Sequence, residues 1–269
     1  MTSTTPRFAE LSAPAHWRVV DFISDLHLQA GEPLTVQTWV RYLDQTRADA
    51  VFILGDLFEV WVGDDGLDGD DQDARFEREC IEKLQAAGQR CALYFLHGNR
   101  DFLLGAEAAR RAHCNLLDDP TVLAFGGERW LLSHGDALCL DDREYLAFRA
   151  QVRTETWQQA FLAQPLAQRR HIARDLRQHS EERKRSGVSY ADVDAPMARA
   201  WLQSAHAPTL IHGHTHKPAD HDLGQGLTRH VLSDWDAGAK PLRAEVLRLS
   251  LQGPQEPVQV RRLPAADIR

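Results

Sequence analysis

Five short segments rich in aspartate, histidine and asparagine each come directly after an apolar run that is typical of a buried β-strand. The segments are 24–27, 55–59, 97–101, 133–136 and 212–216. The runs that end at the first two, 18–24 and 50–54, are rich in valine, isoleucine and phenylalanine. In open α/β sheets, ligands bind beyond the carboxyl ends of the strands. We therefore expect the five segments to meet in one crevice.

The remaining chain predicts an α/β protein with two packed β-sheets flanked by helices. Amphipathic helices are expected at 35–48, 73–87 and 105–113, and Gly88 is placed to end the second of them. The late segments alternate apolar and polar residues, which is typical of half-buried antiparallel strands. The expected strands are 18–24, 50–54, 91–96, 129–132, 209–211, 229–232, 244–251 and 258–263.

Two stretches depart from this alternation. Residues 1–17 contain no apolar segment of signal-peptide length, and we expect a poorly ordered N-terminal extension before the main domain at 18–269. From about 142 to 205 the chain has helical patterning without a convincing strand, which predicts a helical insertion that projects from the core. Its arginines and its apolar residues at helical spacing indicate packed helices with solvated basic faces. No run of about 18 apolar residues occurs, so no membrane span is expected.

Charge and cysteine content limit the classes of function and the cellular compartment that the sequence suggests. A net charge of −8 argues against general affinity for a nucleic-acid backbone. The four cysteines are scattered, without a C-x-x-C pair, and are expected to remain free thiols in a reducing cytoplasm. The acidic, glycine-rich segment 63–73 resembles a calcium loop, but its register fails and it has no closing glutamate. A solvated turn is the preferred interpretation.

The polar residues of the five segments are suited to a divalent metal ion. Carboxylates, imidazoles and an amide oxygen bind zinc, manganese or iron, and the lack of a cysteine cluster disfavours a structural zinc site. A single histidine or aspartate at a strand end is more often a cap or a satisfied polar group. That interpretation does not explain five strand ends that carry a full set. The expected metal ligands are Asp25, His27, Asp56, Asn99, His134, His214 and His216.

The local sequence around these ligands also predicts their surroundings. In the D-x-H and H-x-H motifs, alternate residues point to the same side if the chain is extended, so each pair addresses one metal region. The glycines that precede Asp56, Asn99 and His214 permit a close approach of the backbone to the site. Neighbouring polar residues are expected to structure the turns or orient the ligands. These residues are Glu59, His97, Asp101, Asp136 and His212.

The motifs D-x-H, G-D, G-N, H-G and G-H-x-H, in this order and approximate spacing, resemble those of the calcineurin-like metallophosphoesterase superfamily. The resemblance implies a metallophosphoesterase-type layered core that binds two divalent metal ions. The implied ligands are Asp25, His27 and His216 for one ion, Asn99, His134 and His214 for the second, and Asp56 as the bridge between them.

The third segment departs from the commoner superfamily pattern, in which a histidine follows Gly-Asn. Here the residue is Arg100. An arginine cannot act as a general acid because its pKa stays above about 12. It can hold a phosphate through two hydrogen bonds and stabilise the charge of the transition state. A good leaving group needs little protonation, so this departure favours cleavage of a phosphoanhydride. The catalytic residues under this hypothesis are Asp56, Asn99, Arg100 and His214.

Longer strings narrow the resemblance within the superfamily. SDLHL, ILGDLFEVWVGDD, HGNRDFLLG, SHGDALCLDDREYLAFR and IHGHTHKP are similar to the UDP-2,3-diacylglucosamine diphosphatases of lipid A synthesis, from about 19 to 218. The resemblance implies hydrolysis of UDP-2,3-diacylglucosamine to UMP and 2,3-diacylglucosamine 1-phosphate. Water would attack the uridine-side phosphorus, with manganese as the preferred metal. The implied substrate contacts are Asn99, Arg100, Asp142, Tyr145, Ser180, Lys184 and His214.

The resemblance also implies a cytoplasmic enzyme that lies peripherally on the inner membrane. A basic amphipathic helix in the insertion suits an anionic membrane surface and a slot for acyl chains. The implied partners are the lipid-nucleotide substrate and this membrane, with neither nucleic acid nor an obligate protein partner. Two alternatives stay open: another dinuclear phosphoesterase, such as a dinucleotide polyphosphate hydrolase or a phosphodiesterase, and a non-catalytic binding scaffold. A scaffold would be expected to lose ligands, whereas all seven positions are filled.

Overall fold

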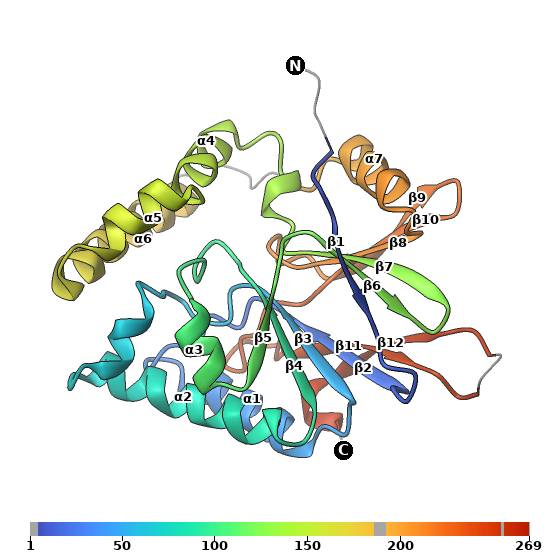
Figure 1. Cartoon of the computed structure of the whole chain (residues 1–269), viewed down its shortest axis with the longest axis horizontal. Helices are drawn as coiled ribbons and strands as arrows, with labels where there is room; N and C mark the ends of the chain where they lie inside the picture. Colours follow the sequence, from blue (N-terminus) through green and yellow to red (C-terminus); the bar gives the residue numbers. More distant parts are fainter. Residues whose placement is uncertain (1–4, 186–191, 254–255, 269) are drawn as a thin grey trace.

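Two six-stranded sheets lie at the centre of the protein (Figure 1), and the aliphatic side chains of their inner strands, such as β3 (Ala50–Leu54) and β8 (Thr209–His212), are buried. The computed structural model describes residues 5–185, 192–253 and 256–268, with the backbone alone for 177–185. The first sheet has the strand order β12-β11-β2-β3-β4-β5, in which β2 to β5 run parallel. Its strands are β2 (Val19–Ile23), β3 (Ala50–Leu54), β4 (Ala92–Leu96), β5 (Cys114–Leu117), β11 (Glu245–Ser250) and β12 (Gln259–Pro264).

The second sheet has the strand order β1-β6-β7-β8-β10-β9. Its strands are β1 (Ala9–Ser12), β6 (Thr121–Phe125), β7 (Glu128–Ser133), β8 (Thr209–His212), β9 (Ala219–Gly224) and β10 (Leu227–Val231). Side chains from both sheets, among them Phe22, Phe52, Leu132 and Ile211, form one buried apolar cluster. The prediction of an α/β fold with two packed sheets is confirmed.

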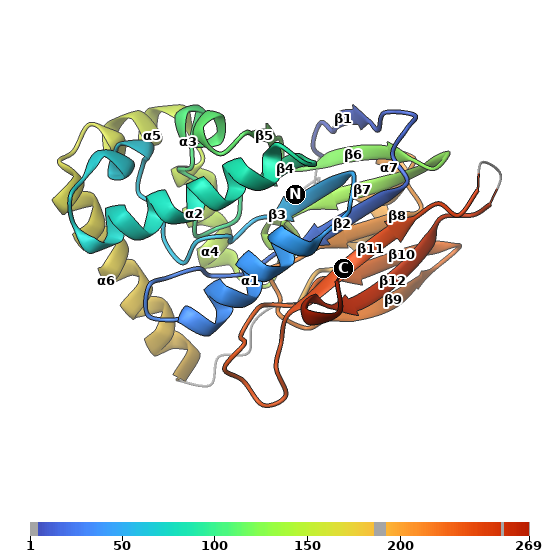
Figure 2. The same cartoon turned by 90° about the horizontal axis from the view of Figure 1, so that it is seen from below.

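Helices cover the outer face of the first sheet (Figure 2). These are α1 (Pro33–Gln45), α2 (Gln72–Gly88) and α3 (Ala106–Arg111). Trp39 of α1 and Leu84 of α2 are buried in the apolar cluster that joins these helices to the strands. Short 3-10 helices occur at Asp64–Asp68, Asp136–Leu138 and Ala265–Asp267.

Three helices of the predicted insertion project together from the core (Figure 1). They are α4 (Arg143–Val152), α5 (Glu155–Leu162) and α6 (Leu166–Arg185), and we call them the helical arm. The next helix, α7 (Ala195–Ala205), packs instead on the second sheet, where Trp201 joins a cluster with residues of β6, β7 and β8. The prediction of one projecting insertion over 142–205 is therefore wrong for α7, because its apolar face is buried against the sheet.

The predicted N-terminal extension contains regular structure. Residues 9–12 form β1, which pairs in parallel with β6, and the Phe8 ring meets the Trp201 ring edge to face with centroids 6.2 Å apart. The prediction of a poorly ordered segment over 1–17 is therefore wrong for these residues. The four cysteines are free, as predicted. Within the described ranges, no helix is long and apolar enough to cross a bilayer.

The acidic, glycine-rich segment before α2 holds the helical arm. Arg169 of α6 is buried and donates to the carbonyl oxygen of Val62 and to the carboxylate of Asp65. Arg170 forms an ion pair with Asp71. The interpretation of this segment as a solvated turn is correct for its exposed carboxylates but omits its role in packing, because Asp65 and Asp71 pair with arginines of the arm and Leu67 is buried.

Glu77 of α2 lies near Arg170, and its burial gives a testable pH dependence. Burial raises the pKa of Glu77 to about 7, while the charge of Arg170 opposes this shift. The folded state therefore holds the Glu77 proton more tightly than the unfolded chain does. The contribution of Glu77 to the free energy of unfolding is expected to fall as pH rises from about 4.5 to about 7, and to stay low above that range.

Glu77→Gln is accordingly expected to be about 1–2 kcal/mol more stable than the parent at pH 8, and little different at pH 5. Urea unfolding of the metal-free protein at both pH values measures this difference. Glu79→Gln, an exposed change on the same helix, is the matched control. A stability difference from the parent that is the same at pH 5 and pH 8 would contradict the assignment.

Candidate dinuclear metal site

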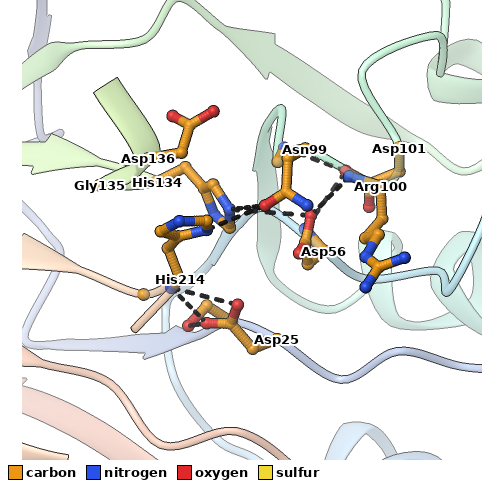
Figure 3. A network of polar contacts seen from close by, with 12 residues as sticks. Asp25, Asp56, Asn99, Arg100, Asp101, His134, Gly135, Asp136 and His214 are labelled. Carbon is orange, nitrogen blue, oxygen red and sulfur yellow. Dashed lines mark hydrogen bonds and ion pairs between the residues drawn. The ribbon is translucent and has the colours of Figure 1, made fainter. Parts of the chain in front are cut away.

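The residues that the sequence predicts as metal ligands meet where the carboxyl ends of strands from both sheets come together. Figure 3 shows Asp25, Asp56, Asn99, His134 and His214 of this set. They lie in the loops after β2, β3, β4, β7 and β8. Contacts between neighbouring polar atoms, 2.9–4.0 Å long, join all seven residues into one cluster. The cluster contains two groups of three residues and one carboxylate between them.

Asp25, His27 and His216 form the first group. The Nε2 atoms of His27 and His216 are 3.3 Å apart, and Nε2 of His216 is 3.3 Å from Oδ1 of Asp25. On the far edge of the His27 ring, Nδ1 lies 3.2 Å from Oε2 of Glu59. A carboxylate at Nδ1 favours a proton there and leaves the Nε2 lone pair directed into the group. Two imidazole nitrogens and a carboxylate oxygen that face one another suit a shared cation.

Asn99, His134 and His214 form the second group. Oδ1 of Asn99 is 3.0 Å from Nε2 of His134 and 2.9 Å from Nδ1 of His214. On its other edge, the buried His134 ring donates from Nδ1 to the carbonyl oxygen of Leu54 at 2.9 Å. This hydrogen bond selects the tautomer in which Nε2 is available as a ligand. As in the first group, potential ligand atoms face one another: here an amide oxygen and two imidazole nitrogens.

Asp56 lies between the two groups. Its Oδ2 is 4.0 Å from Nε2 of His27, and its Oδ1 is 3.7 Å from Nε2 of His134. Oδ1 also accepts a hydrogen bond of 2.9 Å from the N–H of Arg100, which limits rotation of the carboxylate. A buried carboxylate that faces both groups could offer one oxygen to each of two ions.

The electrostatics of the site favour positive charge. Burial alone would lower the pKa of His134, but Asp56, Asp25 and Asp136 outweigh burial and raise that pKa to about 9. Burial and the neighbouring His134 lower the pKa of His214 to about 4. The acids therefore favour the protonated form of His134 when no metal is bound. Metal ions would take the place of that charge, and their binding would release the proton.

Residues beside the cluster structure its turns. The buried carboxylate of Asp101 accepts hydrogen bonds from four backbone N–H groups and ties the loop after β3 to the loop after β4. The donors are Asp56, Leu57, Phe58 and Gly98, at 3.2, 2.7, 3.3 and 3.0 Å. The rings of His97 and His212 contact backbone carbonyl oxygens at 2.7 and 2.8 Å and lie outside the ligand cluster.

The backbone of the cluster differs from the extended conformation that the D-x-H and H-x-H motifs suggested. Five of the predicted ligands have positive φ, a conformation that side-chain-bearing residues adopt rarely. They are Asp25 (54°), His27 (48°), Asp56 (53°), His214 (67°) and His216 (53°). Each such residue costs about 1–3 kcal/mol and persists only where the surrounding structure requires it. The expectation of extended motifs is therefore wrong, although the pairs do point to one region.

A sequence model described as calcineurin-like phosphoesterase matches residues 19–218. The chain belongs to the calcineurin-like phosphoesterase family. The UDP-2,3-diacylglucosamine hydrolase of Aromatoleum aromaticum is 46% identical to this phosphoesterase over 231 residues, which are 82% of this chain and 91% of the relative. Hydrolases of the same name from Chromobacterium violaceum and Chromohalobacter salexigens are 45% and 44% identical, over 81% and 80% of this chain and 91% and 88% of theirs.

Arg100 of this phosphoesterase lies at the edge of the cluster, beside Asp56 (Figure 3). Its side chain is 16% exposed, and Nη1 is 3.5 Å from Oε1 of Glu59. The guanidinium thus carries its charge next to the cluster while part of it remains accessible. This position suits a contact with a phosphate group of a substrate.

The helical arm carries the other predicted substrate contacts. Asp142 caps α4 through a 3.1 Å hydrogen bond from the N–H of Tyr145 to its carboxylate. The Tyr145 ring stacks on His214 at a centroid distance of 5.9 Å. Ser180 and Lys184 belong to α6, but their side chains lie outside the described residues.

The arm also contacts the site through a residue that the sequence did not single out. Arg153 donates to the carbonyl oxygen of Gly98 at 2.6 Å, and its guanidinium lies 5.2 Å from the centroid of the Phe102 ring. The sequence suggested only solvated arginines here. The sequence did contain one indication of this contact: Tyr145, Arg149 and Arg153 are spaced four residues apart, which places them on one face of a helix.

Proposed function

We propose that this phosphoesterase hydrolyses the pyrophosphate bond of UDP-2,3-diacylglucosamine, releasing UMP and 2,3-diacylglucosamine 1-phosphate (lipid X). The observation that supports this most strongly is that relatives named UDP-2,3-diacylglucosamine hydrolase are 44–46% identical over 88–91% of their own length. The presence of Arg100 also suits a pyrophosphate, because the departing phosphate needs no strong acid.

The proposal assigns two divalent metal ions to the cluster. Asp25, His27 and His216 would hold one ion, Asn99, His134 and His214 the other, and Asp56 both. The mixture of oxygen and imidazole ligands, without thiolates, suits manganese. When bound, the ions supply activation of water and neutralisation of charge on the phosphoryl oxygens.

The protein residues supply orientation and further charge. Asn99 and Arg100 hold the phosphoryl group that undergoes attack, and His214 lies within reach of the same group. Arg100 remains cationic throughout and stabilises the additional negative charge of the transition state. Water attacks the uridine-side phosphorus, and the lipid phosphate leaves in line with that attack. No residue in this scheme has to protonate the leaving group.

The proposal places the enzyme in the cytoplasm, peripherally on the inner membrane. Its lipid substrate resides there, and the helical arm has a suitable surface. Leu162 and Leu176 are 41% and 46% exposed, and Arg174 between them in sequence is also exposed. Exposed aliphatic and basic side chains on one helical unit favour binding to an anionic lipid surface.

Hydrolysis in heavy-oxygen water tests the reaction and its site of attack. With manganese present, the label is expected in UMP, because water attacks the phosphorus that stays with uridine. Label found only in the lipid phosphate would contradict this direction of attack. Diadenosine tetraphosphate and bis(4-nitrophenyl) phosphate are the control substrates. If either is hydrolysed as fast as the lipid nucleotide, the proposed substrate is wrong.

A further inference from the structure

Helix α4 of the arm lies against the metal site along one face. Tyr145, Arg149 and Arg153 are spaced four residues apart, so their side chains leave the helix on the same side. Arg153 reaches the loop after β4 through the carbonyl oxygen of Gly98. Tyr145 and Arg149 reach Asp136, in the loop after β7 that also carries the ligand His134.

Arg149 bridges two buried carboxylates. Its Nε donates to Oδ2 of Asp136 at 2.8 Å, and its Nη2 donates to Oδ2 of Asp119 at 3.2 Å. The side chains of Asp136 and Asp119 are 0% and 7% exposed. Ser133 donates to the other oxygen of Asp119 at 2.7 Å. Without the guanidinium, two buried acids would face each other with no cation between them, and Asp136 would move away from Asp119.

Asp136 in turn holds Tyr145 against a metal ligand. The phenol donates to Oδ2 of Asp136, the oxygen that Arg149 also contacts. The Tyr145 ring stacks on His214 with an interplanar angle of 28°. On another side, the His134 ring meets His214 nearly edge to face, at 66°. The orientation of the His214 ring is therefore limited by two rings, one of which belongs to the helical arm.

We propose that Arg149 is a positioning residue for the metal ligand His214. Arg149 fixes Asp136, Asp136 fixes the phenol of Tyr145, and the Tyr145 ring limits the rotation of His214. All of these contacts are between residues of the protein, so the proposal does not depend on the identity of the substrate. Under this proposal, the position of the helical arm determines the orientation of His214 in the second group of predicted ligands.

Manganese binding to the metal-free protein tests the proposal without a substrate. Arg149→Met is expected to lower the affinity of one of the two Mn²⁺ sites about 10–100-fold, as removal of a group that orients a metal ligand does. Arg149→Lys keeps the charge but cannot reproduce the two-pronged contact, and it is expected to recover part of the loss. Arg143→Met removes a charge from an exposed position on the same helix and is expected to leave both affinities unchanged.

Calorimetric titration measures both affinities, and the electron paramagnetic resonance spectrum of bound Mn²⁺ reports the ligand geometry. A spectrum altered in both Arg149 variants and unaltered in Arg143→Met is expected. Parental affinities and a parental spectrum in Arg149→Lys and Arg149→Met would overturn the proposal, as would an equal loss at both sites. If Arg149→Met does not fold, Tyr145→Phe replaces it. That variant keeps the ring but loses the hydroxyl group, and parental binding in it would overturn the proposal as well.

Discussion

Replacing Asp56 with alanine is expected to lower kcat by about 10³-fold or more while the chain still folds. The carboxylate faces both ligand groups, at 4.0 Å from Nε2 of His27 and 3.7 Å from Nε2 of His134. Its loss removes a shared ligand from each proposed metal ion. Metal ions contribute several kcal/mol of transition-state stabilisation, and every 1.36 kcal/mol corresponds to a factor of ten in rate.

The fold is expected to tolerate this change because two effects on stability oppose each other. The N–H of Arg100 loses its acceptor in Asp56, which costs about 1–3 kcal/mol if water does not replace it. Against this, burial raises the pKa of Asp101 to about 7, and the negative charge of Asp56 adds to the increase. The carboxylates of Asp56 and Asp101 therefore repel each other in the metal-free protein. Removal of one carboxylate relieves that repulsion.

Three measurements on Asp56→Ala separate loss of function from loss of fold. They are the metal content after dialysis against Mn²⁺, the thermal midpoint of the metal-free protein, and kcat on the lipid nucleotide. Asp44→Ala, at an exposed position of α1, controls for the removal of one acidic side chain. A variant that retains two Mn²⁺ per chain and more than a tenth of the parental kcat would show that Asp56 is not the bridge.

The identity of the clustered residues was predictable from sequence, but their conformation was not. Parallel strands that end in polar residues place those residues at one edge, whatever the details of each loop. The positive φ of Asp25 and His27 has a tertiary cause. Their N–H groups donate to the carbonyl oxygens of Gly55 and Asp56, each at 3.0 Å, so the loop after β3 shapes the loop after β2. No local pattern encodes a pairing of two separate loops.

The features that the sequence did not predict also depend on contacts between residues far apart in the chain. Strand β1 is only four residues long, and its partner β6 lies more than 100 residues further along the chain. Arg169 and Asp65 are separated by 104 positions, and each charge taken alone is best interpreted as solvated. Only the docking of α6 buries the arginine. The apolar face of α7 was visible as a helical pattern, but the pattern did not show which surface would cover it.

Gly98→Ala is expected to impair the site nearly as much, although it removes none of the predicted ligands. A Cβ atom at position 98 would lie 2.0 Å from Oδ1 and 2.3 Å from the backbone nitrogen of Asp56. The obstacle includes backbone, so no side-chain rotation can relieve it. The loops after β3 and β4 would have to separate by about 1 Å, a displacement that can cost 10²-fold in rate. Asp56 and Asn99 lie on opposite sides of that gap.

Metal affinity, kcat and the thermal midpoint of Gly98→Ala are best compared with those of Gly31→Ala, where a Cβ meets nothing within 4 Å. The expected result is a loss of about 10²-fold or more in kcat, weaker Mn²⁺ binding and a destabilisation of about 1–3 kcal/mol from overpacking. Parental Mn²⁺ affinity in Gly98→Ala would mean that the loops adapt without disturbing the ligands. Asp56→Ala removes a predicted ligand, whereas Gly98→Ala only displaces one. Loss of metal in both would therefore show that the spacing of the loops, as well as the set of ligand residues, determines binding.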